Sequence, residues 1–483
     1  MESEIHAAVD PQADHMQNRH HLIFPPELLG AIFDDVVSLF PDEAHSECSE
    51  SSHRTLYTSS SAQQKRCFDS FSLVCRQWQE LSQVYLYRTL ALEFCHEEIP
   101  HKRTLAEILA WQRLYPYLSC HVRNVKLVMF SEYGGYTDAV EGCDPRLLHT
   151  ILHHFTKLRS VDLVDITFGS GLLQEYFSAP SVNWDISARP PLLKLDELKL
   201  HYTNDSFSTV DSTLVLLSWF SEVNNVLIQH ECGLNWIAGI PLDDRKALIP
   251  ANLKTPLLTI KSFGLDQGII EHLLASPTFS AGILQKLTIS VDGSGQNEVK
   301  LLPSASQSGV HELCLDMIRW YRMAQEDLLR STGAQILNMI AFKDTTYLSF
   351  TRLTLKIPEL PYNINTHGGI SNTYLNAQSA LSFFLGFIFL PVVSVQTVAL
   401  VIVIGDGCEI QSDEYLAIRA ACYSFGWFSF RFLDDVLPEL KAVESVEVTM
   451  EGEQGKSFRL SDEQQSEARA SLKRLDEKGL LRF

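Results

Sequence analysis

Basic residues are scarce in this chain, and they form no cluster. Its 483 residues include 39 lysines and arginines against 59 aspartates and glutamates, which gives a formal net charge of −20. A surface with this balance repels the phosphate backbone of nucleic acids unless a local basic patch reverses the effect, and the sequence contains no such patch. We therefore expect no nucleic-acid binding, whereas a basic partner or substrate is electrostatically favourable.

Cysteines at regular spacing are absent as well. The chain has ten cysteines, and no two of them form a CxxC pair. Most lie within apolar runs, as Cys75, Cys314 and Cys422 do, and this placement is typical of reduced, buried thiols. Thiols stay reduced in the cytoplasm and the nucleus, so we expect the protein in one or both of these compartments.

The N-terminus has no apolar segment of the kind that a secretory signal needs, and residues 1–20 are expected to form a disordered tail. Charge is also missing from residues 380–405, which are apolar enough to suggest a membrane span. Pro391 divides this run into a helical pattern at 380–390 and a β-branched strand pattern at 395–404, and no Lys or Arg cluster flanks it. We therefore expect a soluble protein with no membrane partner.

Motifs of known enzymes are absent or incomplete. The sequence contains neither a GxSxG nucleophile elbow nor a GxGxxG turn. Residues 450–457, MEGEQGKS, resemble the phosphate loop GxxxxGK[ST], but Met450 replaces its first glycine, and Glu451 and Glu453 would repel a phosphate. We expect a turn there between a strand and the last helix, and we expect no catalytic residues and no cofactor.

Two histidines have the spacing of metal ligands. His149 and His153 are four residues apart, so on a helix they would share one face and could bind one ion. No Cys, Asp or Glu set nearby completes a tetrahedral site, and His154 lies off that face. We expect solvated histidines and no metal site.

Two stretches with helical periodicity lie near the N-terminus, separated by a serine-rich insert at 41–66 whose composition is typical of disorder. Pro25 and Pro26 suit the start of the first helix, because proline has a fixed φ and no amide donor. Such short helices are unstable alone, so they must pack on each other and on another element. Their apolar positions are Leu28, Leu29, Ile32, Phe33, Val36 and Val37 in the first stretch and Phe71, Val74, Trp78, Leu81 and Tyr85 in the second.

These stretches resemble the F-box, a helical module that binds substrate receptors to the Skp adaptor of a cullin–RING ubiquitin ligase. The resemblance rests on FPPELL at 24–29, Ile32 and Phe33, SLVCRQW at 72–78, and YLYRTL at 85–90, which is similar to the end of the fungal form. Phe24 differs from the leucine usual in the family, and the insert separates the two halves. An ordinary helical hairpin that opens a larger domain is the alternative.

The resemblance implies an F-box at residues 21–92 and the Skp adaptor as a partner. Matched to the family motif, the adaptor contacts would be Pro25, Leu28, Leu29, Ile32, Val74, Cys75 and Trp78. Ile32 and Trp78 suit the core of the module equally well.

Residues 93–460 contain a recurring apolar-x-x-apolar-x-apolar pattern, and several copies follow a helical pattern. A repeated unit of helix and strand favours parallel strands, because each helix carries the crossover between two of them. The copies are Val122/Val125/Leu127, Leu158/Val161/Leu163, Leu195/Leu198/Leu200, Val223/Val226/Ile228, Ile260/Phe263/Leu265, Leu284/Leu287/Ile289, Val310/Leu313/Leu315, Phe350/Leu353/Leu355, Val395/Val398/Leu400 and Val443/Val446/Val448. The helical patterns lie at 147–155, 214–223, 268–275, 320–340, 380–390 and 430–440, and Thr104 with Glu107 has the spacing of a capping box for another helix.

We predict an α/β fold in which the F-box is followed by an irregular leucine-rich-repeat-like solenoid of parallel strands and helices, because such a module commonly carries one. The intervals are longer and less regular than the leucine-rich norm of ~20–29 residues. A compact, doubly wound α/β domain would give the same alternation. Residues 461–483, with Ser461 as the N-cap, would form a helix that covers the open end of the array.

The resemblance implies a substrate receptor of an SCF-type cullin–RING ubiquitin ligase, which binds the adaptor through the F-box and a protein substrate through the solenoid. Such a receptor performs no catalysis itself. A leucine-rich-like interaction scaffold outside any ligase is the second hypothesis, and an α/β enzyme of unrecognised type is the third. An enzyme would require a deep polar pocket.

Overall fold

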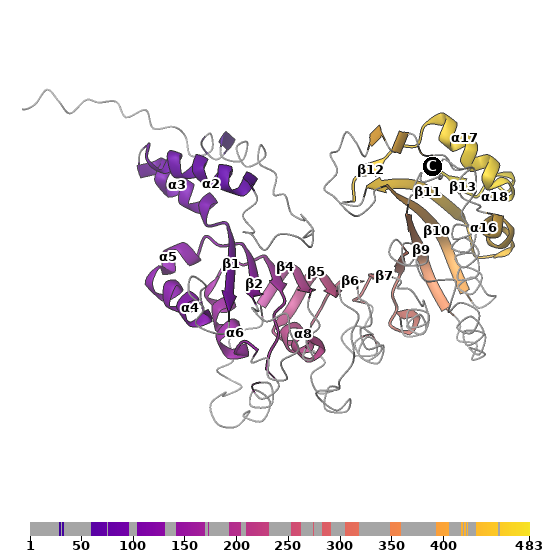
Figure 1. The fold of residues 1–483 in the computed structure, drawn as a ribbon. Coiled ribbons are helices and arrows are strands. Elements are labelled where there is room, and N and C mark those ends of the chain that lie inside the picture. Colours follow the sequence, from indigo (N-terminus) through magenta and orange to yellow (C-terminus); the bar gives the residue numbers. More distant parts are fainter. Residues whose placement is uncertain are drawn as a thin grey trace, which may run out of the picture. The chain divides into compact units, whose positions relative to one another are not determined.

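The chain divides into two compact units, Met1–His45 with His53–Leu86 and Ser46–Ser52 with Tyr87–Phe483, and each is considered by itself. The structure is a computed structural model of the whole chain (Figure 1). It describes residues 29, 31–32, 59–74, 76–95, 104–130, 142–169, 172, 193–203, 209–230, 253–261, 274, 283–290, 305–317, 348–358, 393–404, 417–418, 420–421, 423, 431–452 and 455–483. The predicted tail at 1–20 lies outside these residues.

The described part of the first unit includes helices α2 (Ser59–Ser72) and α3 (Arg76–Leu86). Aromatic rings join them: the buried Phe68 of α2 stacks on Tyr85 of α3 with 5.3 Å between ring centroids, and Phe71 makes an edge contact with Trp78 at the same distance. Each such pair adds about 0.5–1.5 kcal/mol to the stabilisation from burial. The two helices therefore form one small aromatic core.

Helix α2 begins earlier than the sequence predicts. Residues 59–66, which composition assigns to the disordered insert at 41–66, form its first turns. The second apolar stripe also spans two helices, because α2 ends at Ser72. The hydroxyls of Ser70 and Ser72 donate to carbonyls four and three residues earlier, and such contacts compete with continuation of a helix.

The second unit is built on a 13-stranded sheet whose strands lie in chain order from β1 to β12, with β13 paired to β11. Pairing is parallel from β1 to β11, β12 is antiparallel to β11, and β13 is parallel to it. The predicted α/β class with parallel strands is confirmed. The strands are β1 (Thr89–Cys95), β2 (Asn124–Phe130), β3 (Ser160–Val164), β4 (Leu193–Tyr202), β5 (Phe220–His230), β6 (Leu257–Lys261), β7 (Lys286–Ser290), β8 (Glu312–Asp316), β9 (Leu348–Pro358), β10 (Val393–Ile404), β11 (Ser445–Gly452), β12 (Ser457–Phe458) and β13 (Leu481–Arg482).

Two rows of apolar side chains cross the buried face of the sheet, because the register keeps the inward residues of neighbouring strands opposite one another. One row contains Leu90, Val125, Val161, Leu198, Val226, Leu258, Leu287, Leu313, Leu353, Val398 and Val446, and the other contains Leu92, Leu127, Leu163, Leu200, Ile228, Ile260, Ile289, Leu315, Leu355, Leu400 and Val448. All members from β2 to β11 are buried. The rows form the centre of one continuous core.

These rows confirm every predicted apolar triplet except the one that begins at Ile260. In β6, Leu258 and Ile260 take the second and third positions of the triplet, and Thr255, just before the strand, takes the first. The buried hydroxyl of Thr255 donates to the carbonyl of Leu257 at 2.9 Å. A search for apolar residues alone misses a buried threonine whose hydroxyl forms a hydrogen bond in this way.

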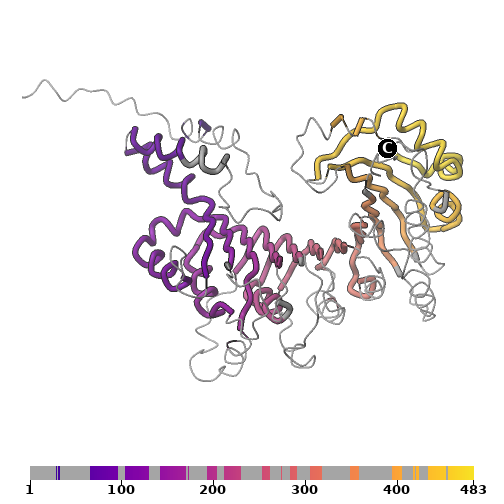
Figure 2. The backbone as a smooth tube through the Cα atoms, viewed as in Figure 1, coloured from indigo at the N-terminus to yellow at the C-terminus, as the bar shows by residue number. Residues whose placement is uncertain are grey.

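Helices pack against the apolar face of the sheet and contribute to the same core. Figure 2 shows the backbone of these helices and strands as a tube coloured along the sequence. Gln112 of α4 donates to the carbonyl of Ile151 in α6 at 3.0 Å, and His149 of α6 contacts Trp219 at the end of α8. The helices are α4 (Leu105–Leu114), α5 (Pro116–Ser119), α6 (Pro145–His154), α8 (Thr209–Ser218), α16 (Arg431–Val436), η4 (Leu437–Glu439), α17 (Asp462–Ser471) and α18 (Lys473–Glu477).

Three of the expected helices are confirmed: the one capped by Thr104 and Glu107, the one at 147–155, and the one at 430–440. The pattern at 214–223 extends too far, because α8 ends at Ser218 and β5 follows almost at once. The patterns at 268–275, 320–340 and 380–390 lie outside the described residues, apart from Leu274.

Strand β10 contains the predicted strand at 395–404, so this part of the apolar run is not helical. The helices that the structure describes include none long and apolar enough to cross a membrane.

The C-terminal residues cover one edge of the sheet. Strand β13 pairs with the first half of β11 and β12 with its second half, so an edge that could pair with another chain is occupied. The turn expected at 450–457 is confirmed as the hairpin between β11 and β12, in which Gly455 has φ 84°. A hairpin of two strands is not a strand–loop–helix phosphate loop.

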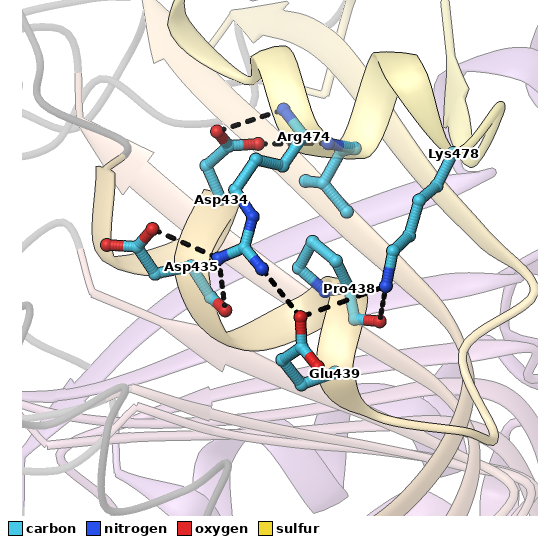
Figure 3. A network of polar contacts seen from close by, with 7 residues as sticks. Asp434, Asp435, Pro438, Glu439, Arg474 and Lys478 are labelled. Atoms are coloured by element: carbon cyan, nitrogen blue, oxygen red, sulfur yellow. Dashed lines mark hydrogen bonds and ion pairs between the residues drawn. The ribbon is translucent and has the colours of Figure 1, made fainter.

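The last helices are held by a polar network (Figure 3). Ser461 is the N-cap, as expected, and it forms a capping box with Gln464; the helix breaks at Leu472 into α17 and α18. The two carboxylate oxygens of the buried Asp434 accept the backbone N–H groups of Arg474 and Leu475, each at 3.0 Å. The Arg474 guanidinium bonds with Asp435 and Glu439, and Lys478 donates to the carbonyl of Pro438.

Candidate functional site

One candidate surface is the turn between α2 and α3. Leu73 and Val74 are 86% and 62% exposed there, although leucine and valine are usually buried. The amides of Leu73 and Val74 donate to the carbonyls of Ser70 and Phe71 at 3.2 and 3.1 Å, so the backbone fixes the turn. Two adjacent exposed apolar side chains on a small helical unit are suited to protein binding.

The structure places the predicted adaptor contacts in different environments. Val74 is exposed, Ile32 and Trp78 are half-buried, and Leu29 has no exposed surface. A side chain buried to this degree cannot reach a partner, so we assign Leu29 to the core of the unit. Pro25, Leu28 and Cys75 lie outside the described residues.

Leu73 was missing from the predicted contacts, although it stands inside the matched segment at 72–78. Helical periodicity does not select it, because it lies beside the apolar stripe and not within it. Its position after the last turn of α2, which only the structure reveals, is what exposes it.

A second candidate surface is the face of the sheet opposite the apolar rows. Side chains alternate along a strand, so each residue between two inward positions points to this other face. The basic residues there are Lys126, Lys199, Lys261, Lys286, Arg352 and Lys356, and the acidic ones are Glu93, Asp162, Glu197, Glu312, Asp316, Glu447 and Glu451. The two signs are almost balanced, although the whole chain carries a net charge of −20. This polar face therefore lacks the general acidity of the chain.

Charges at the N-terminal end of the polar face neutralise one another. Asp162 of β3 lies 3.6 Å from Lys126 of β2 and 3.6 Å from the His201 ring of β4. Glu197 of β4 pairs with Lys199 at 3.1 Å. These pairs hold the charged side chains on the sheet.

Charges at the C-terminal end of the polar face form a longer network. Lys286 of β7 pairs with Glu312 of β8 at 2.8 Å, and Arg352 of β9 lies 3.8 Å from the same carboxylate. Arg352 then bonds at 2.6 Å with Glu447 of β11, and this hydrogen bond raises the pKa of the arginine. Four strands are thereby linked through alternating charges.

Lys356 of β9 makes a parallel contact with Glu451 of β11 at 2.8 Å. Burial by itself would lower the pKa of Lys356, but the hydrogen bond and the charge of Glu451 outweigh that effect and raise it. The lysine is therefore a firmly charged part of the polar face.

The centre of the polar face carries little charge. Strands β5 and β6 present Asn225, Leu227, Gln229, Leu257 and Thr259 there, and the charged Lys261 follows at the end of β6. Leu257 is 38% exposed, more than any other large apolar side chain on the described part of this face. An apolar centre within a polar rim is the usual composition of a protein-binding surface.

Two buried thiols of this unit have raised pKa values. Burial raises the pKa of the Cys314 thiol on the polar face to about 11, and it raises that of Cys143 further, so both are neutral at pH 7. No group of three or more His, Cys, Asp or Glu side chains in the described ranges is arranged to hold a metal ion. No protein-family model matches the chain, and no curated protein matches it significantly.

Proposed function

We propose that the chain is a non-catalytic substrate receptor of an SCF-type cullin–RING ubiquitin ligase. In this proposal the first unit is an F-box that binds the Skp adaptor, and the second is an irregular leucine-rich-repeat-like solenoid that binds a protein substrate on its polar face. The ligase's other subunits perform the chemistry, and the receptor raises the local concentration of the substrate beside them.

The exposed pair Leu73 and Val74 is the observation that carries the proposal. It lies within the segment 72–78 that resembles the F-box most closely, on a helical unit whose aromatic residues are used internally. Exposed apolar residues on a folded unit favour a partner that covers them. An F-box needs such residues to bind its adaptor.

The strand order supports the solenoid. Parallel strands are joined by right-handed crossovers, so strands added always in the same direction place all their helices on one face of the sheet. A doubly wound domain reverses its strand order, which covers both faces and forms a crevice at the switch point. Strands β1 to β11 show no reversal, and apart from β10 their second face is mostly polar. This arrangement favours the solenoid over the doubly wound domain.

The sparsely charged centre of the polar face suggests where a substrate binds. Leu227 and Leu257 could contact an apolar residue of the substrate, and the paired charges around them would form the rim. Because those charges are already paired, they offer little net attraction, and we expect binding to depend weakly on salt.

A binding experiment with purified Skp adaptor tests the proposal. We expect the intact chain to bind, and we expect the double variant Leu73→Asp with Val74→Asp to lose at least tenfold in affinity. Leu114→Asp is the matched control, because Leu114 is equally exposed but belongs to the second unit. Circular dichroism must show that all three proteins are folded.

Failure of the folded intact chain to bind the adaptor would overturn the ligase proposal. The interaction scaffold would then be the better hypothesis, because the polar face and its apolar centre do not depend on an adaptor.

A further inference from the structure

Two histidine rings meet on the surface of α6. His149 and His153 stand one turn apart, and their Nε2 atoms are 3.2 Å from each other, with 4.4 Å between ring centroids. His149 is only 6% exposed and its ring contacts Trp219 at 5.1 Å, whereas His153 is half-buried. The expectation of two solvated histidines is therefore wrong for His149, which the helix packing holds in one orientation.

The distance between the two nitrogens is that of two ligands on one metal ion. Imidazole nitrogens lie about 2.0–2.1 Å from Zn²⁺, and at a tetrahedral angle two of them are about 3.3 Å apart. We propose that His149 and His153 bind one transition-metal ion through their Nε2 atoms. Imidazole favours Zn²⁺, Cu²⁺ and Ni²⁺, whereas Mg²⁺ and Ca²⁺ prefer oxygen ligands.

The position on the helix favours a cation. His153 lies in the last turn of α6, which ends at His154, and the carbonyls of a helix C-terminus carry partial negative charge. Burial and then the charge of His154 lower the pKa of His153, so its ring is neutral at pH 7 and able to act as a ligand. His154 itself is held elsewhere, with Nδ1 2.8 Å from the carbonyl of Thr150.

The chain supplies two ligands at this site. In the ranges that the structure describes, no third His, Cys, Asp or Glu joins the pair, so water or a group from a partner would complete the coordination. The ion would then link the last two turns of α6 and stabilise that helix. This inference is independent of the proposed ligase role.

The same 3.2 Å distance also fits a direct hydrogen bond in which one ring donates to the other, so a metal titration must separate the two. Full-length, metal-free protein is titrated with Zn²⁺ and with Mg²⁺ at pH 7.5 by calorimetry. The chain has 17 histidines, so total binding alone does not identify the site. The variant His153→Gln removes one ligand, and His154→Gln is its matched control on the same turn.

We expect one Zn²⁺ per chain to bind to wild type and to His154→Gln, at least tenfold weaker binding to His153→Gln, and no heat with Mg²⁺. Cu²⁺ should quench tryptophan fluorescence in wild type more than in His153→Gln, because Trp219 contacts His149. Zinc should also raise the melting temperature of wild type and His154→Gln only. Equal zinc binding by both variants, or none by wild type, would overturn the proposal and leave the direct hydrogen bond.

Discussion

Arg352 on β9 bonds with Glu447 on β11 across the intervening strand β10, with 2.6 Å between Nη2 and Oε2. Lys356 and Glu451 bridge the same strand four residues further along β9 and β11. Between these pairs β10 presents Ala399, which is buried. Strand β10 is thus covered on both faces, which explains why its sequence is continuously apolar and resembles a membrane segment.

We predict a measurable coupling between Arg352 and Glu447. In a double-mutant cycle of Arg352→Met and Glu447→Gln, the coupling should be about 0.5–1 kcal/mol, since both side chains are about one-third exposed and solvent screens the pair. The more exposed pair Lys194 and Glu222 is the control, and it should couple more weakly. Urea unfolding measures both, and an equal or larger coupling in the control would contradict the prediction.

Truncation of Leu29 should lower the stability of the first unit much more than truncation of Val74. Leu29→Ala leaves a cavity in the first unit and should destabilise that unit by about 2–5 kcal/mol, because the side chain is completely buried. Val74→Ala should change stability by less than about 0.5 kcal/mol, because the side chain is largely exposed. Thermal unfolding with limited proteolysis of the first unit measures both changes. A Leu29→Ala variant as stable as wild type would show that Leu29 is not a core residue.

Gly142 should tolerate no side chain. A Cβ there would lie 2.2 Å from the amide nitrogen of Gly169 and 2.3 Å from the carbonyl carbon of Phe168, both of them backbone atoms. Gly142→Ala should therefore cost about 3 kcal/mol. At Gly479 a Cβ would meet nothing, and only its φ of 68° opposes alanine, so Gly479→Ala should cost about 1 kcal/mol. Chemical denaturation that ranked the two variants in the reverse order would refute this assignment.

The regular part of the fold could be predicted from the sequence because inward positions repeat along each strand. The triplets in β2 to β5 and β7 to β11 were recognisable, since the register aligns apolar residues. The triplet of β6 was displaced because Thr255 fills an apolar position with its hydroxyl bonded locally. The end of α8 was misplaced because an apolar run satisfies a buried helix and a buried strand equally.

The candidate sites were less predictable. Arg352 and Glu447 are distant in sequence, and only the sheet register brings them together. The spacing of His149 and His153 was visible, but the burial of His149 depends on Trp219, which lies between α8 and β5, far along the chain. Exposure of Leu73 depends on where α2 ends. Periodicity describes one element at a time, so it does not reveal contacts between elements.

Asp434 should be important for attachment of α18. Its carboxylate accepts two backbone N–H groups, one on each oxygen, whereas asparagine has a single acceptor oxygen. Asp434→Asn should therefore cost about 2 kcal/mol, because a bond to a buried charged acceptor is lost and an amide N–H is left unpaired. The neighbouring Asp435→Asn, at an exposed position, should change stability by less than about 0.5 kcal/mol. Thermal unfolding of both variants measures the difference.

Acid should destabilise the second unit through His153. Burial and then the charge of His154 lower the folded-state pKa of His153 below its ordinary value of 6.5. Below that pH the unfolded chain therefore binds the proton more readily than the folded chain does. The contribution of the neutral His153 ring to the free energy of unfolding is complete above about pH 6.5, and it is lost as the pH falls through the folded-state pKa. His121, whose pKa burial and Lys157 also lower, acts in the same direction.

The pH dependence can be assigned to His153 by comparing variants. We expect the free energy of unfolding of wild type to fall between pH 7.5 and pH 5, and the fall to be smaller in His153→Gln, because the titrating ring is gone. His154→Gln tests the neighbouring charge, and it should reduce the fall only slightly, since burial is the larger cause of the shift. A chelator in every sample keeps metal binding out of the comparison. An unchanged fall in His153→Gln would mean that other groups titrate in this range, and His121→Gln would then be the next variant to examine.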